Sequence, residues 1–181
     1  MNADPLKVLY VDDDHNDLAL FAAAAEKTDL DIWVHTASAV DQAVEMLEGR
    51  GNYADRSLHP LPDLILLDLV MPAPSGFDFL QWHFDSAFKS IPVIVFCGSS
   101  YEDDRQRALT LGASFFVEKP AGFGELQQVV RRLWSFGMNH RRGAVPESGA
   151  SRPEGARKPE GRGQVGALTA RSTRNVRTGS R

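Results

Sequence analysis

The chain of 181 residues carries 20 Lys and Arg against 24 Asp and Glu, a single cysteine, and 43% apolar residues. This length and composition suit one globular domain with an appendage, and a lone cysteine excludes an internal disulfide and a cysteine-rich zinc site. No apolar run approaches the roughly 18 residues needed to span a bilayer, and the apolar stretch 18–25 follows aspartates rather than the basic flank of a signal peptide, so we expect a soluble cytoplasmic protein.

The charge of the chain changes sign near residue 137. Residues 1–137 contain 10 Lys and Arg against 21 Asp and Glu, whereas residues 138–181 contain 10 Lys and Arg against 3 Glu. The second segment has no Phe, Trp or Tyr, so it has too little apolar surface to offset the entropy of ordering its backbone. We therefore expect one domain over 1–137 and a disordered basic Gly/Arg/Pro-rich tail over 138–181. Nucleic-acid binding by the tail is not favoured, because no aromatic residue interleaves with its arginines. Attraction to an acidic partner or to the acidic domain of the same chain, and the absence of any role, all stay open.

Short apolar runs alternate with segments of helical periodicity along the first 137 residues. The runs predict strands at 6–11, 31–35, 64–67, 92–96 and 115–117. Apolar residues recur at helical spacing over 18–25, 40–47, 77–84, 108–111 and 126–133. Gly49, Gly112 and Gly137 are the predicted ends of the second, fourth and fifth helices. Five strand-then-helix units predict an α/β fold, a doubly wound five-stranded parallel sheet with helices on both faces.

Charged side chains follow three of the predicted strands. Asp12 and Asp13 come directly after the first strand, Asp68 after the third and Lys119 after the fifth. In a sheet of order 2-1-3-4-5 the three carboxyl groups would converge at the edge where ligands bind. Carboxylates this close repel one another unless a cation lies between them, and an all-oxygen site suits Mg²⁺. Taken singly, each aspartate could equally be a solvated turn or capping residue.

Two flanking residues bear on the same edge. Asp14 could cap the first helix or simply face water. Pro120 is expected to hold a tight turn after Lys119, with a cis peptide bond as one option. The ammonium group of Lys119 would then pair with a carboxylate or a phosphoryl oxygen.

Three motifs resemble those of a known family: Val11-Asp12-Asp13, then Asp68-Leu69-Val70-Met71-Pro72 with Gly76, then Lys119-Pro120. In this order and spacing they are similar to the signature of the response-regulator receiver domain of two-component signalling, over about residues 5–137. The long loop before the third strand and the region 91–99 are most similar to stand-alone receivers, some of which serve phytochrome-like sensor kinases. The resemblance implies the flavodoxin-like receiver fold.

The resemblance also implies the chemistry of the site. Asp68 would be the phosphoacceptor that takes a phosphoryl group from the phosphohistidine of a sensor histidine kinase. Asp12 and Asp13 would hold Mg²⁺, with Asp68 completing the ligand set, and Lys119 would help to neutralise the phosphoryl oxygens. Receiver domains catalyse their own phosphorylation and dephosphorylation, so we do not expect an enzyme in the usual sense.

Two residues of the family's switching relay differ here. Cys97 stands where receivers usually place Thr or Ser, and a thiol is a weaker hydrogen-bond donor. Ser99 or Ser100 could reach in instead, and Cys97 is more readily interpreted as a small buried apolar residue than as a redox sensor. Phe116, three residues before Lys119, occupies the position of the family's switching aromatic residue, and core packing explains it equally well.

We expect a single-domain response regulator that acts through phosphorylation-dependent protein–protein interaction or phosphorelay. Its partners would be a sensor histidine kinase and a downstream protein, met by a surface that includes Tyr101, Arg105 and Phe116. The alternative is a switching-impaired receiver that acts as a constitutive interaction scaffold, and Cys97 favours it. The five histidines are dispersed without ligand spacing, so a histidine metal site is not expected. No glycine-rich phosphate loop follows a strand, so no nucleotide cofactor is expected.

Overall fold

The computed structural model describes residues 4–98 and 102–143, which belong to the first of two units, 1–147 and 148–181, into which the chain divides. Five parallel strands form one sheet in the order β2-β1-β3-β4-β5. The strands are β1 (Leu6–Val11), β2 (Ile32–Ala37), β3 (Leu64–Leu67), β4 (Val93–Cys97) and β5 (Phe115–Glu118). The helices are α1 (His15–Glu26), α2 (Val40–Glu48), α3 (Gly76–Asp85), α4 (Glu102–Thr110) and α5 (Phe123–Arg141), with a short 3-10 helix η1 at Gly51–Tyr53. The predicted doubly wound α/β fold and its strand order are confirmed.

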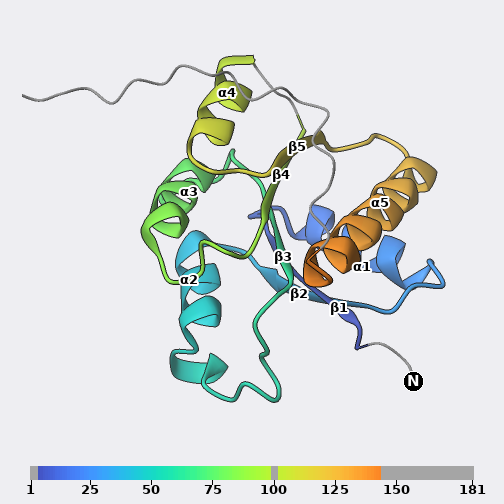
Figure 1. The fold of residues 1–181 in the computed structure, drawn as a ribbon. Coiled ribbons are helices and arrows are strands. Elements are labelled where there is room, and N and C mark those ends of the chain that lie inside the picture. The colour runs from blue at the N-terminus through green and yellow to red at the C-terminus, as the bar shows by residue number, and fades with distance from the viewer. Residues whose placement is uncertain (1–3, 99–101, 144–181) are drawn as a thin grey trace, which may run out of the picture. The chain divides into compact units, whose positions relative to one another are not determined.

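Helices cover both faces of the sheet, as expected for a doubly wound fold. Figure 1 shows α1 and α5 on one side of the strands and α2, α3 and α4 on the other. Alternate residues of β1 serve the two layers: Tyr10 packs in the α1/α5 layer, whereas Leu9 packs in the other. Strands β3 and β4 are buried along their whole length, which explains their continuous apolar sequences.

Backbone hydrogen bonds continue past the ends of the strands and align the residues that follow them. The Asp12 amide donates to the Ala37 carbonyl (3.0 Å), and the Asp68 amide donates to the Val11 carbonyl (2.9 Å). The Lys119 amide donates to the Cys97 carbonyl (2.9 Å). The charged residues after β1, β3 and β5 are therefore held at one edge of the sheet by the ladder itself.

Helix α5 continues beyond its predicted end at Gly137. A Cβ atom on Gly137 would lie 2.6 Å from Cδ1 of Leu6 and 2.9 Å from Cδ2 of Leu64, so the glycine lets the helix approach the sheet. The prediction that the helix ends at Gly137 is wrong, because this glycine serves close packing instead of termination. Gly49, in contrast, has φ +67° and ends α2 as predicted. Of the predicted tail, 138–181, the part beyond residue 143 lies outside the described residues.

The last turn of α5 is tied to the start of the chain. The Arg141 guanidinium donates from Nη1 to the carbonyl of Asp4 (2.8 Å) and from Nη2 to that of Pro5 (2.9 Å). Its Nε also donates to Oδ1 of Asp63 (3.0 Å), and the two side chains form an ion pair. These contacts place residue 141 within the folded domain.

The apolar stripe predicted for α3 is partly wrong. Leu80 is buried as expected, but Phe84 is 54% exposed. The residues that face the core are instead Phe79, Leu80 and His83. The core-facing side of α3 therefore differs by one residue from the prediction. The apolar Phe84 was taken as the core position, but the neighbouring His83 occupies it.

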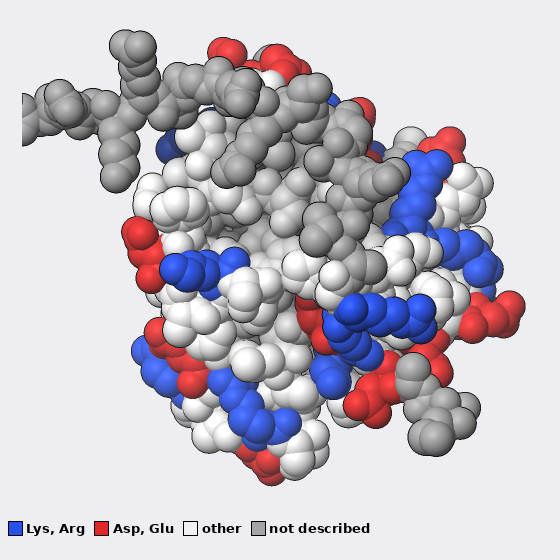
Figure 2. Space-filling view, viewed as in Figure 1, with Lys and Arg blue, Asp and Glu red and all other residues white. Residues whose placement is uncertain are grey.

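None of the helices among residues 4–98 and 102–143 is long and apolar enough to cross a membrane. Acidic and basic side chains are intermixed on the face shown in Figure 2.

Candidate functional site

Three carboxyl groups converge at the carboxyl edge of the sheet. Asp12, Asp13 and Asp68 each offer a ligand oxygen, and these oxygens lie within 4.8 Å of one another. Asp12 is fully buried, Asp13 is exposed, and the Asp68 side chain keeps 10% of its surface accessible. The structure therefore brings together the three aspartates singled out from the sequence.

Lys119 reaches into the same cluster from the end of β5. Its Nζ donates to Oδ2 of Asp12 (2.6 Å), to Oδ2 of Asp17 (2.7 Å) and to Oδ2 of Asp68 (3.1 Å). Burial alone would lower the pKa of Lys119, but the hydrogen bonds to Asp12 and Asp17 and the charge of Asp68 outweigh it and raise the pKa above its usual value. The lysine is therefore a permanent cation at neutral pH.

The peptide bond after Lys119 is trans. Among the described residues the cis peptide bond is that between Ala73 and Pro74. The option of a cis turn at Pro120 is therefore wrong.

The sequence did not single out Tyr10 or Asp17, yet both contact the cluster. The Tyr10 hydroxyl donates to Oδ2 of the buried Asp12 at 2.5 Å, and the Asp14 amide donates to Oδ1 (3.0 Å). Burial, and then the hydrogen bond to Asp12, raise the pKa of the Tyr10 phenol above its usual value, so the phenol keeps its proton. The i, i+2 spacing of Tyr10 and Asp12 along the first strand was an available signal, whereas the place of Asp17 in the first turn of α1 gave none.

Asp68 lies in a tight turn between β3 and α3. Its Oδ1 accepts from the Val70 amide (3.1 Å), which orients the carboxylate away from the core. A Cβ atom on Gly76 would lie 2.1 Å from the Asp68 carbonyl oxygen and 2.7 Å from Cα of Leu69. Only glycine lets the start of α3 fold back this closely on the residue that carries the carboxylate.

The cluster opens into a pocket of about 370 Å³. The lining residues are Asp13, Asp14, Asp17, Asp68, Val70, Cys97, Gly98 and Lys119. Asp68 therefore lines a hollow that is open to an incoming group.

The remaining residues singled out from the sequence occupy three different environments. Asp14 caps α1, because its Oδ1 accepts from the Asn16 amide at 2.8 Å, and that hydrogen bond lowers the pKa of the exposed Asp14 carboxyl. Cys97 is 2% exposed at the end of β4 and borders the pocket. Phe116 is half-buried against the α2/α3/α4 layer. Ser99, Ser100 and Tyr101 lie outside the described residues.

The donor set fits a hard divalent cation. Three carboxyl groups, those of Asp12, Asp17 and Asp68, contact the Lys119 ammonium group, and Asp13 joins Asp12 and Asp68 as a fourth carboxyl group at this edge. Carboxylate oxygens with one exposed member match the oxygen-rich, partly hydrated coordination that Mg²⁺ and Mn²⁺ prefer. Such an ion would balance the negative charge that one lysine leaves uncompensated.

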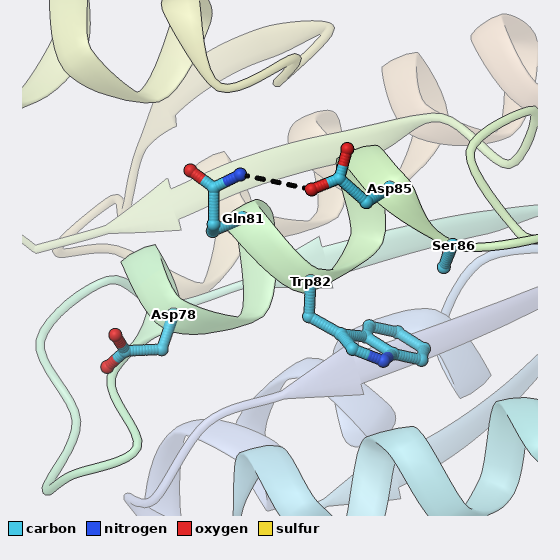
Figure 3. A pocket seen from close by; sticks show the side chains of 5 residues that line it. All are labelled: Asp78, Gln81, Trp82, Asp85 and Ser86. Carbon is cyan, nitrogen blue, oxygen red and sulfur yellow. Dashed lines mark hydrogen bonds between the residues drawn. The ribbon is translucent and has the colours of Figure 1, made fainter. Parts of the chain in front are cut away.

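A second hollow, of about 440 Å³, lies on α3 and contains none of these residues. Figure 3 shows Gln81 and Asp85 on one side of the helix, joined by a 3.4 Å hydrogen bond, with Trp82 pointing the other way. Asp78 and Ser86 complete the lining. All the lining residues belong to α3 or follow it directly, and none of them is a lysine or an arginine. The hollow therefore offers no chemistry comparable to that of the acidic cluster.

A 2-1-3-4-5 sheet whose carboxyl edge carries three convergent aspartates and a lysine defines the flavodoxin-like receiver class of α/β proteins. The family model described as "Response regulator receiver domain" matches residues 8–131. The chain belongs to the response regulator receiver domain family.

Individual relatives agree with this membership. Response regulator Rre1 of Synechocystis sp. is 30% identical over 132 residues, which cover 72% of this chain and 52% of Rre1. The phosphorylated cyanobacterial phytochrome response regulator RcpA is 30% identical with a TM-score of 0.66, covering 74% of this chain and 94% of RcpA. The Mn²⁺-bound form of response regulator Rcp1 is 28% identical with a TM-score of 0.62, covering 73% and 94%. The chain spans about half or less of the first curated relatives that it matches.

Proposed function

We propose that this protein is a stand-alone response regulator that accepts a phosphoryl group on Asp68 in a Mg²⁺-dependent reaction. The observation that carries the proposal is the convergence of Asp12, Asp13 and Asp68 around Lys119 at the mouth of one pocket. A structural role alone would not require three carboxylates from two strands beside a cation from a third.

The transfer step uses an oxygen of Asp68 as the nucleophile. It attacks the phosphorus of a phosphohistidine on the kinase, an O–P bond forms as the P–N bond breaks, and the released imidazole takes a proton from solvent. Val70 and Lys119 hold the carboxylate in place from either oxygen. Lys119, kept charged by its neighbours, stabilises the negative charge of the transferred group.

The metal would be held by Asp12, Asp13 and Asp68. It supplies neutralisation of the phosphoryl oxygens when it is bound. Tyr10 and the Asp14 amide fix the Asp12 carboxylate from both of its oxygens, so this ligand is oriented before the ion arrives. The relatives support this part of the proposal, because RcpA is described as phosphorylated and Rcp1 as Mn²⁺-bound.

Output would come through binding to a downstream protein or through phosphorelay, and the protein would act in the cytoplasm. The proposed contact surface lies on α4, β5 and α5 and includes Arg105 and Phe116. Arg105 is exposed and Phe116 is half-buried, so one is available to a partner and the other can change its packing.

Labelling with acetyl phosphate and detection by intact mass tests the proposal. We expect the wild-type chain to gain one phosphoryl group with Mg²⁺ and none with EDTA, and Asp68→Asn to gain none. Asp85→Asn, which removes an exposed carboxyl group on α3, is the matched control and should label normally. Normal labelling of Asp68→Asn would refute the assignment of the acceptor.

A constitutive interaction scaffold is the second candidate, favoured by the buried Cys97 at the end of β4. A thiol donates a weaker hydrogen bond to a phosphoryl oxygen than a hydroxyl does. Amide hydrogen exchange of the phosphorylated chain distinguishes the two. A switch changes the protection of α4 and β5 upon phosphorylation, whereas a scaffold accepts the phosphoryl group without any change in protection.

A further inference from the structure

Two histidines that lie 24 residues apart in the sequence meet beside β2. The ring centres of His35 and His59 are 6.2 Å apart, with the planes inclined at 60°. Nε2 of His35 and Nδ1 of His59 are both buried, and neither has a hydrogen-bond partner among the described residues. Buried imidazole nitrogens are normally paired, so two unpaired ones on neighbouring rings point to a shared ligand.

Both rings line the same small cavity, of about 10 Å³. The other lining residues are Leu9, Met46, Pro60 and Pro62. A buried water normally makes about three hydrogen bonds. The lining offers a water only two polar side chains, the imidazoles, and the remaining side chain with a heteroatom is the thioether of Met46. A thioether is a poor acceptor for water and a good ligand for a soft metal ion.

One arginine holds together the two segments that carry Met46 and His59. Nη1 of Arg56 donates to the Met46 carbonyl (2.8 Å) and to the His59 carbonyl (3.2 Å), and Nη2 donates to the Leu47 carbonyl (2.6 Å). The Tyr53 ring packs edge-on against His59, with 5.1 Å between the centres. His59 is therefore fixed beside Met46, and β2 holds His35 opposite them.

The spacing of the rings fits two ligands on one ion. With a metal–nitrogen distance of about 2.0 Å, two ligating imidazoles have ring centres at most about 6.4 Å apart, in a linear arrangement. The observed 6.2 Å is close to that limit. Two imidazoles at this spacing, with a thioether lining the same cavity, suit a d¹⁰ monovalent ion, for which copper(I) is the biological choice.

We propose that His35, Met46 and His59 form a binding site for a single soft metal ion, copper(I). The site lies on β2, α2 and the 50–63 loop, and it shares no residue with the acidic cluster. It is therefore independent of the proposed phosphorylation. We did not expect a histidine metal site from the sequence, because the ligands come from three separate segments.

Anaerobic competition of the full chain against bicinchoninate for copper(I) tests this site. We expect the wild-type chain to withdraw one equivalent of copper(I), and both His35→Gln and His59→Gln to lose that equivalent. Met46→Leu conserves side-chain volume and should weaken the affinity while the fold is kept. His140→Gln removes an exposed histidine on α5 and should bind like the wild type.

X-ray absorption of the wild-type chain loaded with copper(I) provides a measurement that needs no variant. We expect nitrogen neighbours near 2.0 Å with a more distant sulfur. No binding by the wild-type chain, unchanged binding in folded His35→Gln and His59→Gln, or a coordination shell dominated by the thiolate of Cys97 would each overturn the proposal.

Discussion

The hydroxyl group of Tyr10 offers the sharpest test of how the acidic edge is held in place. Tyr10→Phe removes one oxygen from a ring that is otherwise fixed by Phe21 and Phe96, whose centres lie 5.1 and 5.8 Å away. Asp12 then loses one of the three donors to its carboxylate while remaining fully buried. Because a hydrogen bond to a buried charge contributes about 1.5–3 kcal/mol, we expect the free energy of unfolding to fall by that amount.

Urea denaturation at pH 7, followed by circular dichroism, measures this loss. The matched control is Tyr53→Phe, because the Tyr53 hydroxyl accepts from the neutral Gln42 amide (2.9 Å) and its loss should cost only about 0.5–1.5 kcal/mol. A Tyr10→Phe variant no less stable than Tyr53→Phe would refute the view that the phenol supports Asp12.

The difference in stability between the wild type and Tyr10→Phe should also depend on pH. Burial, and then the hydrogen bond to Asp12, raise the pKa of Tyr10 above the ordinary value of 10.0, so the unfolded state loses its phenol proton first. The stabilisation is therefore fully present below pH 10 and is lost as the pH rises beyond it. The difference between wild type and Tyr10→Phe should shrink above pH 10, and a difference that grows there would contradict the assignment.

Three further predictions concern packing, acid stability and switching. Gly137→Ala should lower the free energy of unfolding by about 1–3 kcal/mol, because the added Cβ would meet Leu6 and Leu64. Gly124→Ala, on the open side of α5, should not lower it, and equal effects of the two variants in urea denaturation would count against this prediction. Burial lowers the pKa of His83 below 6.5, so the unfolded state binds a proton first and the free energy of unfolding should fall as the pH drops below 6.5. His83→Phe should lessen that fall, and an identical pH dependence of the variant below 6.5 would disprove the prediction. Cys97→Thr should enlarge the change in amide exchange of α4 upon phosphorylation, and an unchanged difference would reject a weak thiol coupling.

The acidic edge could be predicted because its geometry follows from the sheet. Asp12 and Asp68 each directly follow an apolar run, Lys119 follows another after Glu118, and parallel strands end at a common edge. Strand alternation could also have identified Tyr10, since it shares a face with Asp12, whereas Asp17 joins the cluster only through its tertiary contact with Lys119. The role of Tyr10 was missed because its ring already fitted the apolar run of the first strand. The role of Asp17 was missed because its position on a helix already explained an acidic residue.

Other features depend on tertiary contacts that local sequence does not encode. Gly137 carries the same signal whether it ends a helix or lets a helix approach the sheet, and only the positions of Leu6 and Leu64 decide between these roles. Phe84 and His83 exchange their expected places because one residue of helical phase separates them. His35 and His59 meet where the 50–63 loop, tied to α2 by Arg56, passes β2.

Chemical localisation of the phosphoryl group tests the central proposal most directly. Borohydride reduces an aspartyl phosphate to homoserine, so peptide mass spectrometry after labelling and reduction identifies the acceptor in the wild-type chain. We predict homoserine at position 68 in the sample with Mg²⁺ and unmodified aspartate there in the sample with EDTA. Homoserine at position 12, 13 or 17 with an intact Asp68, or no homoserine in a folded and Mg²⁺-loaded chain, would contradict the proposed function.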